Sequence, residues 1–356
     1  MKYLLAGLST RGLAESAVKA GKDVLTIDFF GDLDQEHICR NICLRREYNA
    51  RLDFLDPFLF LKASGTVEFD GLVYVSPLEN YSLIIKKFAE KCEIIGNGAG
   101  PVKKVRDWRN LHRFCRKYNI LFPETFDGLD YVVKPKKSGG GIRIQRLSSC
   151  IVQQFVKGEN FSASFLGNGK ETEVVSVNEQ LIGRKEFGAR KFWYCGNITP
   201  VFVDKEEKIG DICRKLVREF RLKGNCGIDF VVNDGLYFLE VNPRPQATLE
   251  LIERAFDVNM FVLHEKAYTG TLEKTGNPKR TWGKAILYAE EDVVMPDTRT
   301  WLAHGWIKDI PHPSERIRKS EPVCTVIADG LDRDDCFEHL VARTESVRGF
   351  IQNSKN

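Results

Sequence analysis

The chain lacks the cysteine and histidine patterns that hold zinc or build a nucleophilic triad. Its ten cysteines form no C-x-x-C pair, and its six histidines show neither H-x-H nor H-E-x-x-H spacing. Cys39 and Cys43 could share one face of a helix, but no second Cys or His pair completes a zinc set. We therefore expect free thiols packed as small apolar side chains, and chemistry that uses neither zinc nor a serine or cysteine nucleophile.

Long apolar runs and a strong excess of one charge are also absent. No stretch approaches the roughly 20 apolar residues that span a bilayer, and the apolar part of MKYLLAGLSTRG is too short for a signal peptide. The net charge is +4, from 53 basic and 49 acidic residues, so no strong field toward nucleic acid or a membrane surface follows. These absences predict a cytoplasmic protein with no nucleic-acid or membrane partner.

The glycine fingerprints of common nucleotide sites are missing from the first loop. Residues 3–6 and 23–29 are expected strands around a helix at 13–20, and a strand at 71–75 continues a parallel α/β unit. The loop between the first strand and helix lacks G-x-G-x-x-G, and Leu13-Ala14 stands where a P-loop has Lys-Ser/Thr. A dinucleotide oxidoreductase stays an alternative that rests on this unit alone.

What the chain does contain is a distinctive segment at residues 227–245, GIDFVVNDGLYFLEVNPRP. β-Branched and aromatic runs flank Asn233-Asp234-Gly235, a pattern that predicts two strands joined by a tight turn. Glu240 and Asn242 are two residues apart and therefore point from the same face of the second strand. In an antiparallel hairpin, Asp229 lies across from that end of the second strand, close to Glu240.

Three oxygen donors that converge on one face suit a hard cation that keeps some waters, which means magnesium or manganese. Arg244 follows two residues after Asn242 and offers a planar donor for a phosphate or carboxylate beside that metal. The alternative is a surface hairpin with solvated charges. The apolar run between the two acids favours a buried hairpin instead.

Three further features precede this hairpin in the sequence. A strand that begins near residue 130 ends in Lys134, and the glycine loop Ser138-Gly139-Gly140-Gly141 can bring backbone N–H groups close to phosphate oxygens. The strand at 151–156 then offers its backbone to an adenine edge, and Glu159 can accept hydrogen bonds from ribose hydroxyls. Each feature alone is more often structural, but their order indicates a lid over a triphosphate. Single helices are expected at 102–119, 205–220 and 250–268.

This order resembles the ATP-grasp superfamily over the whole chain, in particular a carboligase branch related to biotin carboxylase. The resemblance implies an α/β fold, α+β in part, built from four regions. These are a Rossmann-like pre-ATP domain at 1–98, a linker helix and small β-rich lid at 99–157, a metal-bearing core at 158–270, and a C-terminal extension of strands and a helix at 271–356 that packs on the core.

The resemblance also implies roles for individual residues. Asp229, Glu240 and Asn242 would hold the magnesium ions. Lys134 would bind the α- and β-phosphates under the loop formed by Ser138, Gly139, Gly140 and Gly141, and together with Arg244 it would stabilise the transferred phosphoryl group. Gln154, Phe155 and Val156 would contact adenine, and Glu159 would bind ribose. One departure is that Asp107 is followed by Trp108, where the family usually has a lysine. Either Arg109 or Lys104 takes over that phosphate contact, or nucleotide affinity is weaker.

By this resemblance the chain would be a ligase that uses ATP and Mg2+, or Mn2+. It would activate a small-molecule carboxylate as an acyl phosphate and join it to an amine, with release of ADP and phosphate. A homodimer is left open as the assembly. The alternatives are a bicarbonate-dependent carboxylase and a non-catalytic ATP-binding protein.

Overall fold

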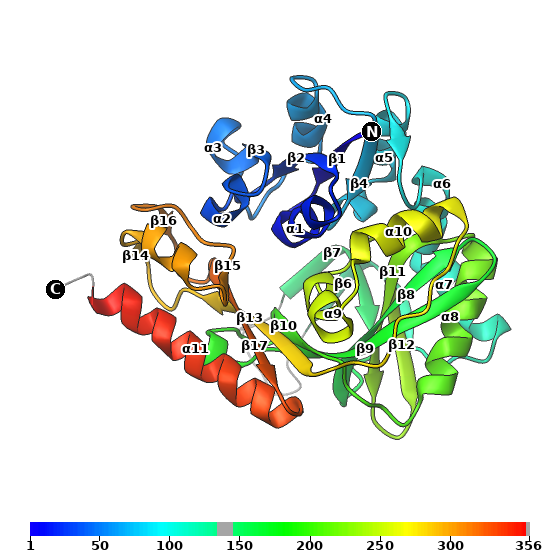
Figure 1. Cartoon of the computed structure of the whole chain (residues 1–356). Coiled ribbons are helices and arrows are strands. Elements are labelled where there is room, and N and C mark those ends of the chain that lie inside the picture. Colours follow the sequence, from blue (N-terminus) through cyan, green and yellow to red (C-terminus); the bar gives the residue numbers. More distant parts are fainter. Residues whose placement is uncertain (134–144, 354–356) are drawn as a thin grey trace.

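The computed structural model describes residues 1–133 and 145–353. Its N-terminal part is a five-stranded parallel sheet in the order β3-β2-β1-β4-β5, coloured blue to cyan in Figure 1. The strands are β1 (Lys2–Ala6), β2 (Asp23–Asp28), β3 (Arg40–Cys43), β4 (Gly71–Tyr74) and β5 (Glu93–Ile94). Its helices are α1 (Arg11–Lys19), α2 (Leu33–Glu36), α3 (Leu44–Glu47), α4 (Phe58–Ser64) and α5 (Ser82–Ala89), with the 3-10 turn η1 (Leu78–Asn80). The predicted parallel α/β unit is confirmed.

The larger part is built on an eight-stranded antiparallel sheet in the order β12-β11-β8-β9-β10-β13-β17-β15. Its strands are β8 (Glu159–Asn168), β9 (Thr172–Ile182), β10 (Tyr194–Thr199), β11 (Lys223–Val232), β12 (Leu236–Asn242), β13 (Thr281–Tyr288), β15 (Ile307–Lys308) and β17 (Pro322–Gly330). The helices that follow residue 200 are α8 (Glu206–Phe220), α9 (Leu249–Phe256), α10 (Met260–Thr269) and α11 (Arg333–Asn353). Two short turns, η2 (Lys185–Phe187) and η3 (Thr298–Ala303), complete this part.

Two small two-stranded sheets lie outside these layers. One pairs β6 (Thr125–Val133) with β7 (Gln145–Gln153), and the other pairs β14 (Val293–Val294) with β16 (Arg316–Ile317). The first lies in the region expected to be the small β-rich lid, and the strand expected over 151–156 instead spans 145–153. Lys134, Ser138, Gly139, Gly140 and Gly141, which were predicted to bind phosphate, lie outside the described residues, so their placement stays a prediction. The region boundaries near residues 98, 157 and 270 also stay predictions.

An apolar cluster joins the two large sheets. Tyr3 of β1 and Leu13 of α1 belong to the same buried cluster as Ile252 of α9, Phe261 of α10 and Leu166 of β8. The Tyr3 and Phe261 rings meet edge to face at 5.3 Å between centroids. Burying these apolar side chains together fixes α1 and its loop against the eight-stranded sheet. Loops from both sheets therefore line one shared cavity.

Two of the three helices expected from periodicity are each divided in two. Residues 102–119 form α6 (Ala99–Val105) and α7 (Trp108–Lys117), because Asp107 caps the second helix by accepting a hydrogen bond from the Arg109 backbone N–H at 2.8 Å. Between α9 and α10, Asp257 adopts a left-handed conformation, and Asn259 caps α10 through the Val262 N–H. The apolar periodicity of the sequence continues across both breaks, so it predicted one helix where the structure has two. The helix predicted at 205–220 is confirmed as α8.

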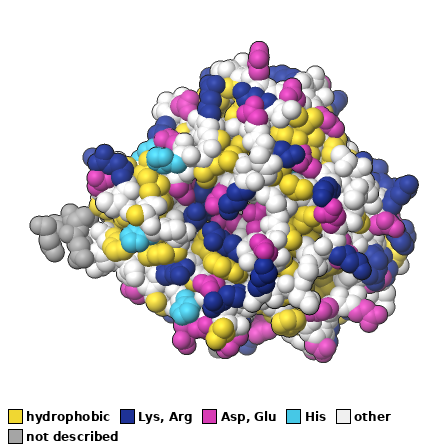
Figure 2. Space-filling model, viewed as in Figure 1, with side chains coloured by type: hydrophobic (Ala, Val, Ile, Leu, Met, Phe, Trp, Pro, Cys, Tyr) yellow, Lys and Arg dark blue, Asp and Glu magenta, His cyan; other side chains and the backbone are white. Residues whose placement is uncertain are grey.

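Other expectations from composition can be compared with the described residues. Nine cysteines in this part of the chain are free, as predicted. No helix there is long and apolar enough to cross a membrane. On the face shown in Figure 2, basic and acidic side chains are interspersed, in keeping with the small net charge.

Candidate functional site

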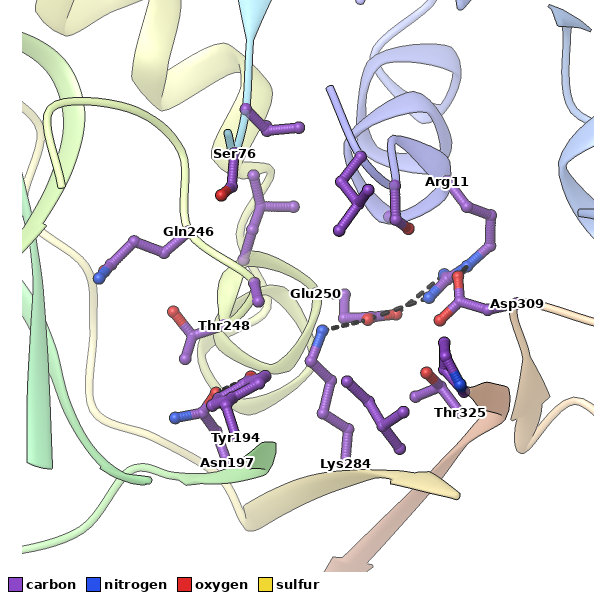
Figure 3. A pocket seen from close by; sticks show the side chains of 18 of the residues that line it. Arg11, Ser76, Tyr194, Asn197, Gln246, Thr248, Glu250, Lys284, Asp309 and Thr325 are labelled. Atoms are coloured by element: carbon purple, nitrogen blue, oxygen red, sulfur yellow. Dashed lines mark hydrogen bonds and ion pairs between the residues drawn. The ribbon is translucent and has the colours of Figure 1, made fainter. Parts of the chain in front are cut away.

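A cavity of about 850 Å³ lies where loops of the parallel sheet meet the antiparallel sheet. One side is formed by the first loops of the chain, with Ser9, Arg11 and Asp32, and the opposite side by the β11–β12 hairpin. Lys284 of β13 and Thr325 of β17 also line it (Figure 3). The cavity therefore draws its lining from segments more than 300 residues apart.

The β11–β12 hairpin brings the predicted oxygen donors together at this cavity. Asp229 pairs directly with Glu240, and Gly227 pairs with Asn242, in antiparallel register. The Asn242 amide Nδ2 donates to Asp229 Oδ2 at 3.0 Å, and Gln180 Nε2 donates to Asp229 Oδ1 at 3.1 Å. Asp229, Glu240 and Asn242 all line the cavity. The predicted hairpin geometry is confirmed, whereas the metal-binding role of its donors stays a prediction.

The two carboxylates of this edge are electrostatically strained in the absence of a bound cation. Burial and the neighbouring Glu240 carboxylate raise the pKa of Asp229 to about 7. Glu240 has a protein cation nearby, because Arg106 Nη1 donates to its Oε2 at 3.0 Å and also to the Val241 carbonyl at 3.0 Å. A divalent cation between the carboxylates would relieve their mutual repulsion.

These donors suit the group that the sequence predicts. Two carboxylates and an amide oxygen are hard oxygen ligands of the kind that Mg2+ and Mn2+ prefer, and Mg2+ usually keeps several waters. Among the described residues, no group of three or more His, Cys, Asp or Glu is arranged to hold a metal. A site with only two protein carboxylates therefore fits a cation that shares its remaining positions with water or phosphate.

Arg244 is held firmly at the same edge. Its Nε donates to Glu79 Oε1 at 3.0 Å, and its Nη2 donates to Asn242 Oδ1 at 3.2 Å. Glu79 is almost fully buried, at 3% exposure, and comes from the turn η1 of the parallel sheet. A buried carboxylate that pairs with an arginine fixes the direction of the guanidinium. Arg244 is thus oriented into the cavity edge by a residue that sequence reasoning missed.

Of the residues predicted to contact adenine and ribose, Glu159 lies beside the hairpin, where it pairs with Val232. Gln154, Phe155 and Glu159 are exposed and Val156 is half-buried, and none of these four lines the cavity. Gly158 passes so close to β11 that an added Cβ would lie 2.4 Å from the Val232 carbonyl oxygen. This part of the chain therefore runs against the far end of the hairpin from Asn242. The nucleotide roles of these residues stay predictions.

The position where the family usually has a lysine is occupied by an aromatic cluster. Trp108 begins α7, and its ring meets His112 edge to face at 5.1 Å between centroids. The Arg109 guanidinium lies over the Trp108 ring, 4.7 Å from its centroid. Arg106, just before the cap, is the cation from this segment that reaches the hairpin edge. The phosphate contact expected of Arg109 or Lys104 stays a prediction.

A second charged group, which includes Arg11, Glu250 and Lys284, also lines the cavity (Figure 3). Arg11, only 1% exposed, binds Glu250 through two hydrogen bonds of 2.9 and 3.0 Å and Asp309 through a third of 2.9 Å. Lys284 Nζ donates to Glu250 Oε1 at 2.9 Å. Burial alone would raise the pKa of Glu250, but Arg11 and Lys284 hold it well below its usual range.

None of the residues in this second group was singled out from the sequence. Their contacts join α1, α9, β13 and the loop after β15, so no short motif contains them. One signal was available for Lys284. It stands within an apolar strand, the pattern that drew attention to Lys134.

The middle of the chain matches a family model described as an ATP-grasp domain, over residues 83–248. An uncharacterized protein of Methanocaldococcus jannaschii is 26% identical over 368 aligned residues, which cover 92% of this chain and 88% of that protein. A tyramine–L-glutamate ligase of Methanocaldococcus fervens is 28% identical over 172 residues, which cover 48% of this chain and 56% of the ligase. The chain thus aligns with only about half of that ligase.

Two solved structures share the fold along nearly the whole chain. The biotin carboxylase domain of a single-chain bacterial carboxylase has a TM-score of 0.70 at 12% identity, and the match covers 97% of this chain and 88% of that one. N5-carboxyaminoimidazole synthetase from Staphylococcus aureus, complexed with ADP, has a TM-score of 0.67 at 17% identity and covers 96% of both chains. At these identities the likeness concerns the fold alone.

Proposed function

Because residues 83–248 match an ATP-grasp domain, we propose that the chain is an ATP-grasp enzyme, an ATP- and magnesium-dependent ligase that joins a small-molecule carboxylate to an amine. The family match and the α/β ATP-grasp fold confirm the resemblance drawn from the sequence. An enzyme of the carboxylate–amine ligase type is what this family match supports. The similar tyramine–L-glutamate ligase adds support for amide formation.

One observation carries the proposal: Asp229, Glu240, Asn242 and Arg244 line the same cavity from one hairpin edge. Asp229, Glu240 and Asn242 would hold magnesium, or manganese, which when bound supplies positive charge beside the phosphate oxygens. Arg244, fixed by Glu79, is placed to donate hydrogen bonds to a phosphoryl group or to a carboxylate beside it.

In this reaction the protein positions the substrates and stabilises the negative charge of the phosphoryl group. The substrate carboxylate attacks the γ-phosphoryl group of ATP, which gives an acyl phosphate and ADP, and the amine then displaces phosphate to form an amide. Neither step needs a side-chain nucleophile. Closure of the lid would keep water from hydrolysing the acyl phosphate. Lys134 and the 138–141 loop would bind the phosphates from the lid, and the 154–159 segment would hold the nucleoside.

The proposal is tested by measuring ADP release from ATP with Mg2+ across a panel of carboxylates and amines, with products identified by mass spectrometry. We expect release that needs one acid and one amine together, and a product mass equal to acid plus amine minus water. The Glu240→Gln and Asn242→Ala variants should lose this release while their circular dichroism spectra match the wild type.

Other outcomes would replace the proposal. Release stimulated by bicarbonate without an amine would indicate a carboxylase. ATP binding without release for any pair would indicate a non-catalytic nucleotide-binding protein. Undiminished turnover in both hairpin variants would contradict the assignment of the metal site.

A further inference from the structure

Asp32 is a buried carboxylate with an unsatisfied oxygen at the wall of the cavity. It stands at the start of α2 and is 7% exposed. Four buried side-chain atoms in the part of the chain that the structure describes lack a hydrogen-bond partner, and one of them is Asp32 Oδ2. The others belong to Gln35, Asn41 and Glu79, which do not line the cavity. Asp32 alone among the four residues therefore faces a space that a ligand could enter.

The cations near Asp32 are committed to other carboxylates. Arg11 is shared among Glu250, Asp309 and Asp34, with N···O distances of 2.9, 2.9 and 3.6 Å. Lys284 is paired with Glu250 at 2.9 Å. No ion pair of the described residues includes Asp32. A buried carboxylate without a partner is costly, so this position favours a ligand that brings positive charge.

Asp309 extends the same negative surface. It lines the cavity, and α2 holds its segment in place, because Asp34 accepts hydrogen bonds from the backbone N–H groups of Asp309 at 3.1 Å and Ile310 at 2.9 Å. Burial and the neighbouring carboxylates Asp309 and Asp34 raise the pKa of Asp32 well above its ordinary value. Two carboxylates from separate segments thus meet at one wall of the cavity.

The cavity also has apolar and aromatic side chains in its lining. Phe30, Leu52 and Ile286 line the cavity, together with Trp193 and Tyr288, whose rings lie 5.3 Å apart between centroids. Asp32 and Asp309 supply two carboxylates, and the cavity that they line also holds apolar and aromatic side chains. An organic cation with an apolar body matches both the acids and the walls.

We propose that Asp32, assisted by Asp309, binds the ammonium group of the amine substrate, and that this substrate is a primary amine with an apolar or aromatic body. This inference rests on the proposed ligase function for its biological meaning. The binding itself needs no nucleotide. An ammonium donates hydrogen bonds to carboxylate oxygens at full charge, which a hydroxyl of the same size cannot replace.

The test is isothermal titration calorimetry of the whole chain without nucleotide. The probes are 2-phenylethylamine and butylamine, each against the alcohol of the same skeleton, 2-phenylethanol and butanol. We expect at least one amine to bind at least tenfold more tightly than its alcohol. Asp32→Asn should weaken amine binding at least tenfold and leave alcohol binding unchanged. Asp53→Asn, at an exposed site outside the cavity, is the matched control and should change neither.

A second variant guards against a folding defect. Asp309→Asn keeps a residue type that tolerates the φ of +52° at this position and should also weaken amine binding. The inference is overturned if amine and alcohol bind equally, if no probe amine binds, or if Asp32→Asn binds amines like the wild type. Amine binding that needs Asp32, with no ADP release for any substrate, would refute the ligase proposal and leave this one standing. If ADP release depends on an amine but the KM for the amine is unchanged in Asp32→Asn, the ligase proposal is supported and the role of Asp32 is refuted.

Discussion

The two charged regions of the cavity differ in how completely their charges are paired. At the β11–β12 edge, Asp229 and Glu240 face each other; the partly exposed Arg106 pairs with Glu240, and Arg244 beside them is paired with the buried Glu79. In the opposite wall, Arg11 and Lys284 satisfy Glu250 from both sides within a buried group. The hairpin edge keeps repulsion that a ligand can relieve, whereas the Arg11–Glu250–Lys284 group pairs its charges internally.

This difference suggests that the hairpin edge serves ligand binding and the Arg11 group serves stability. Repelling carboxylates destabilise the free protein, and a bound cation that relieves them gains affinity. Buried ion pairs contribute little relative to an apolar replacement, but breaking one leaves an uncompensated buried charge. Substitutions at the hairpin edge should therefore change activity more than stability, and substitutions in the Arg11 group should do the opposite.

The largest effect is expected for Asp229→Asn. Removal of this carboxylate should lower acid- and amine-dependent ADP release by about 1,000-fold, which corresponds to about 4 kcal/mol of transition-state stabilisation. The free energy of unfolding should change by less than about 1 kcal/mol, because loss of the repulsion from Glu240 offsets loss of one of the two hydrogen bonds donated by Gln180 and Asn242. Turnover and urea unfolding of the same preparation measure the two effects. A variant that loses stability and activity together would contradict the separation.

Arg11→Met should have the largest effect on stability. It leaves Glu250 with Lys284 alone and removes the hydrogen bond to Asp309, so we expect a loss of about 3–5 kcal/mol in the free energy of unfolding. Urea denaturation followed by circular dichroism gives this value. Arg299→Met, at an exposed pair with Asp297, is the control and should leave the midpoint unchanged.

The same contrast explains which features could be predicted from sequence. The hairpin edge comes from one stretch of 16 residues between Asp229 and Arg244, so strand alternation and a turn motif were enough to place its donors in register. The Arg11–Glu250–Lys284 group joins segments that only tertiary packing brings together. The Arg106–Glu240 contact could not be predicted for a related reason: it joins residues 134 positions apart in the sequence.

Glu250→Gln should give a smaller, pH-dependent loss. Burial opposes ionisation of Glu250, but Arg11 and Lys284 outweigh it and lower its pKa in the folded protein from the ordinary 4.5. A lowered carboxyl pKa contributes stability that is present above the ordinary value and is lost as the pH falls toward the folded value. We expect the variant to be about 2–3 kcal/mol less stable at pH 7, with a difference that shrinks between pH 5 and pH 3. A difference that stays constant over this range would contradict the ion pairing.

The smallest effect on stability is expected for Arg106→Met. Its pair with Glu240 resembles the Arg11–Glu250 pair in distance, 3.0 against 2.9 Å, but the Glu240 side chain is 45% exposed and that of Glu250 only 8%. Water screens the exposed pair, so its removal should cost less than about 1 kcal/mol in urea unfolding. The loss for Arg11→Met under the same conditions should be several times larger. Equal losses of unfolding free energy in Arg106→Met and Arg11→Met would contradict this prediction. They would mean that the Arg106–Glu240 pair stabilises the fold as much as the Arg11–Glu250 pair does.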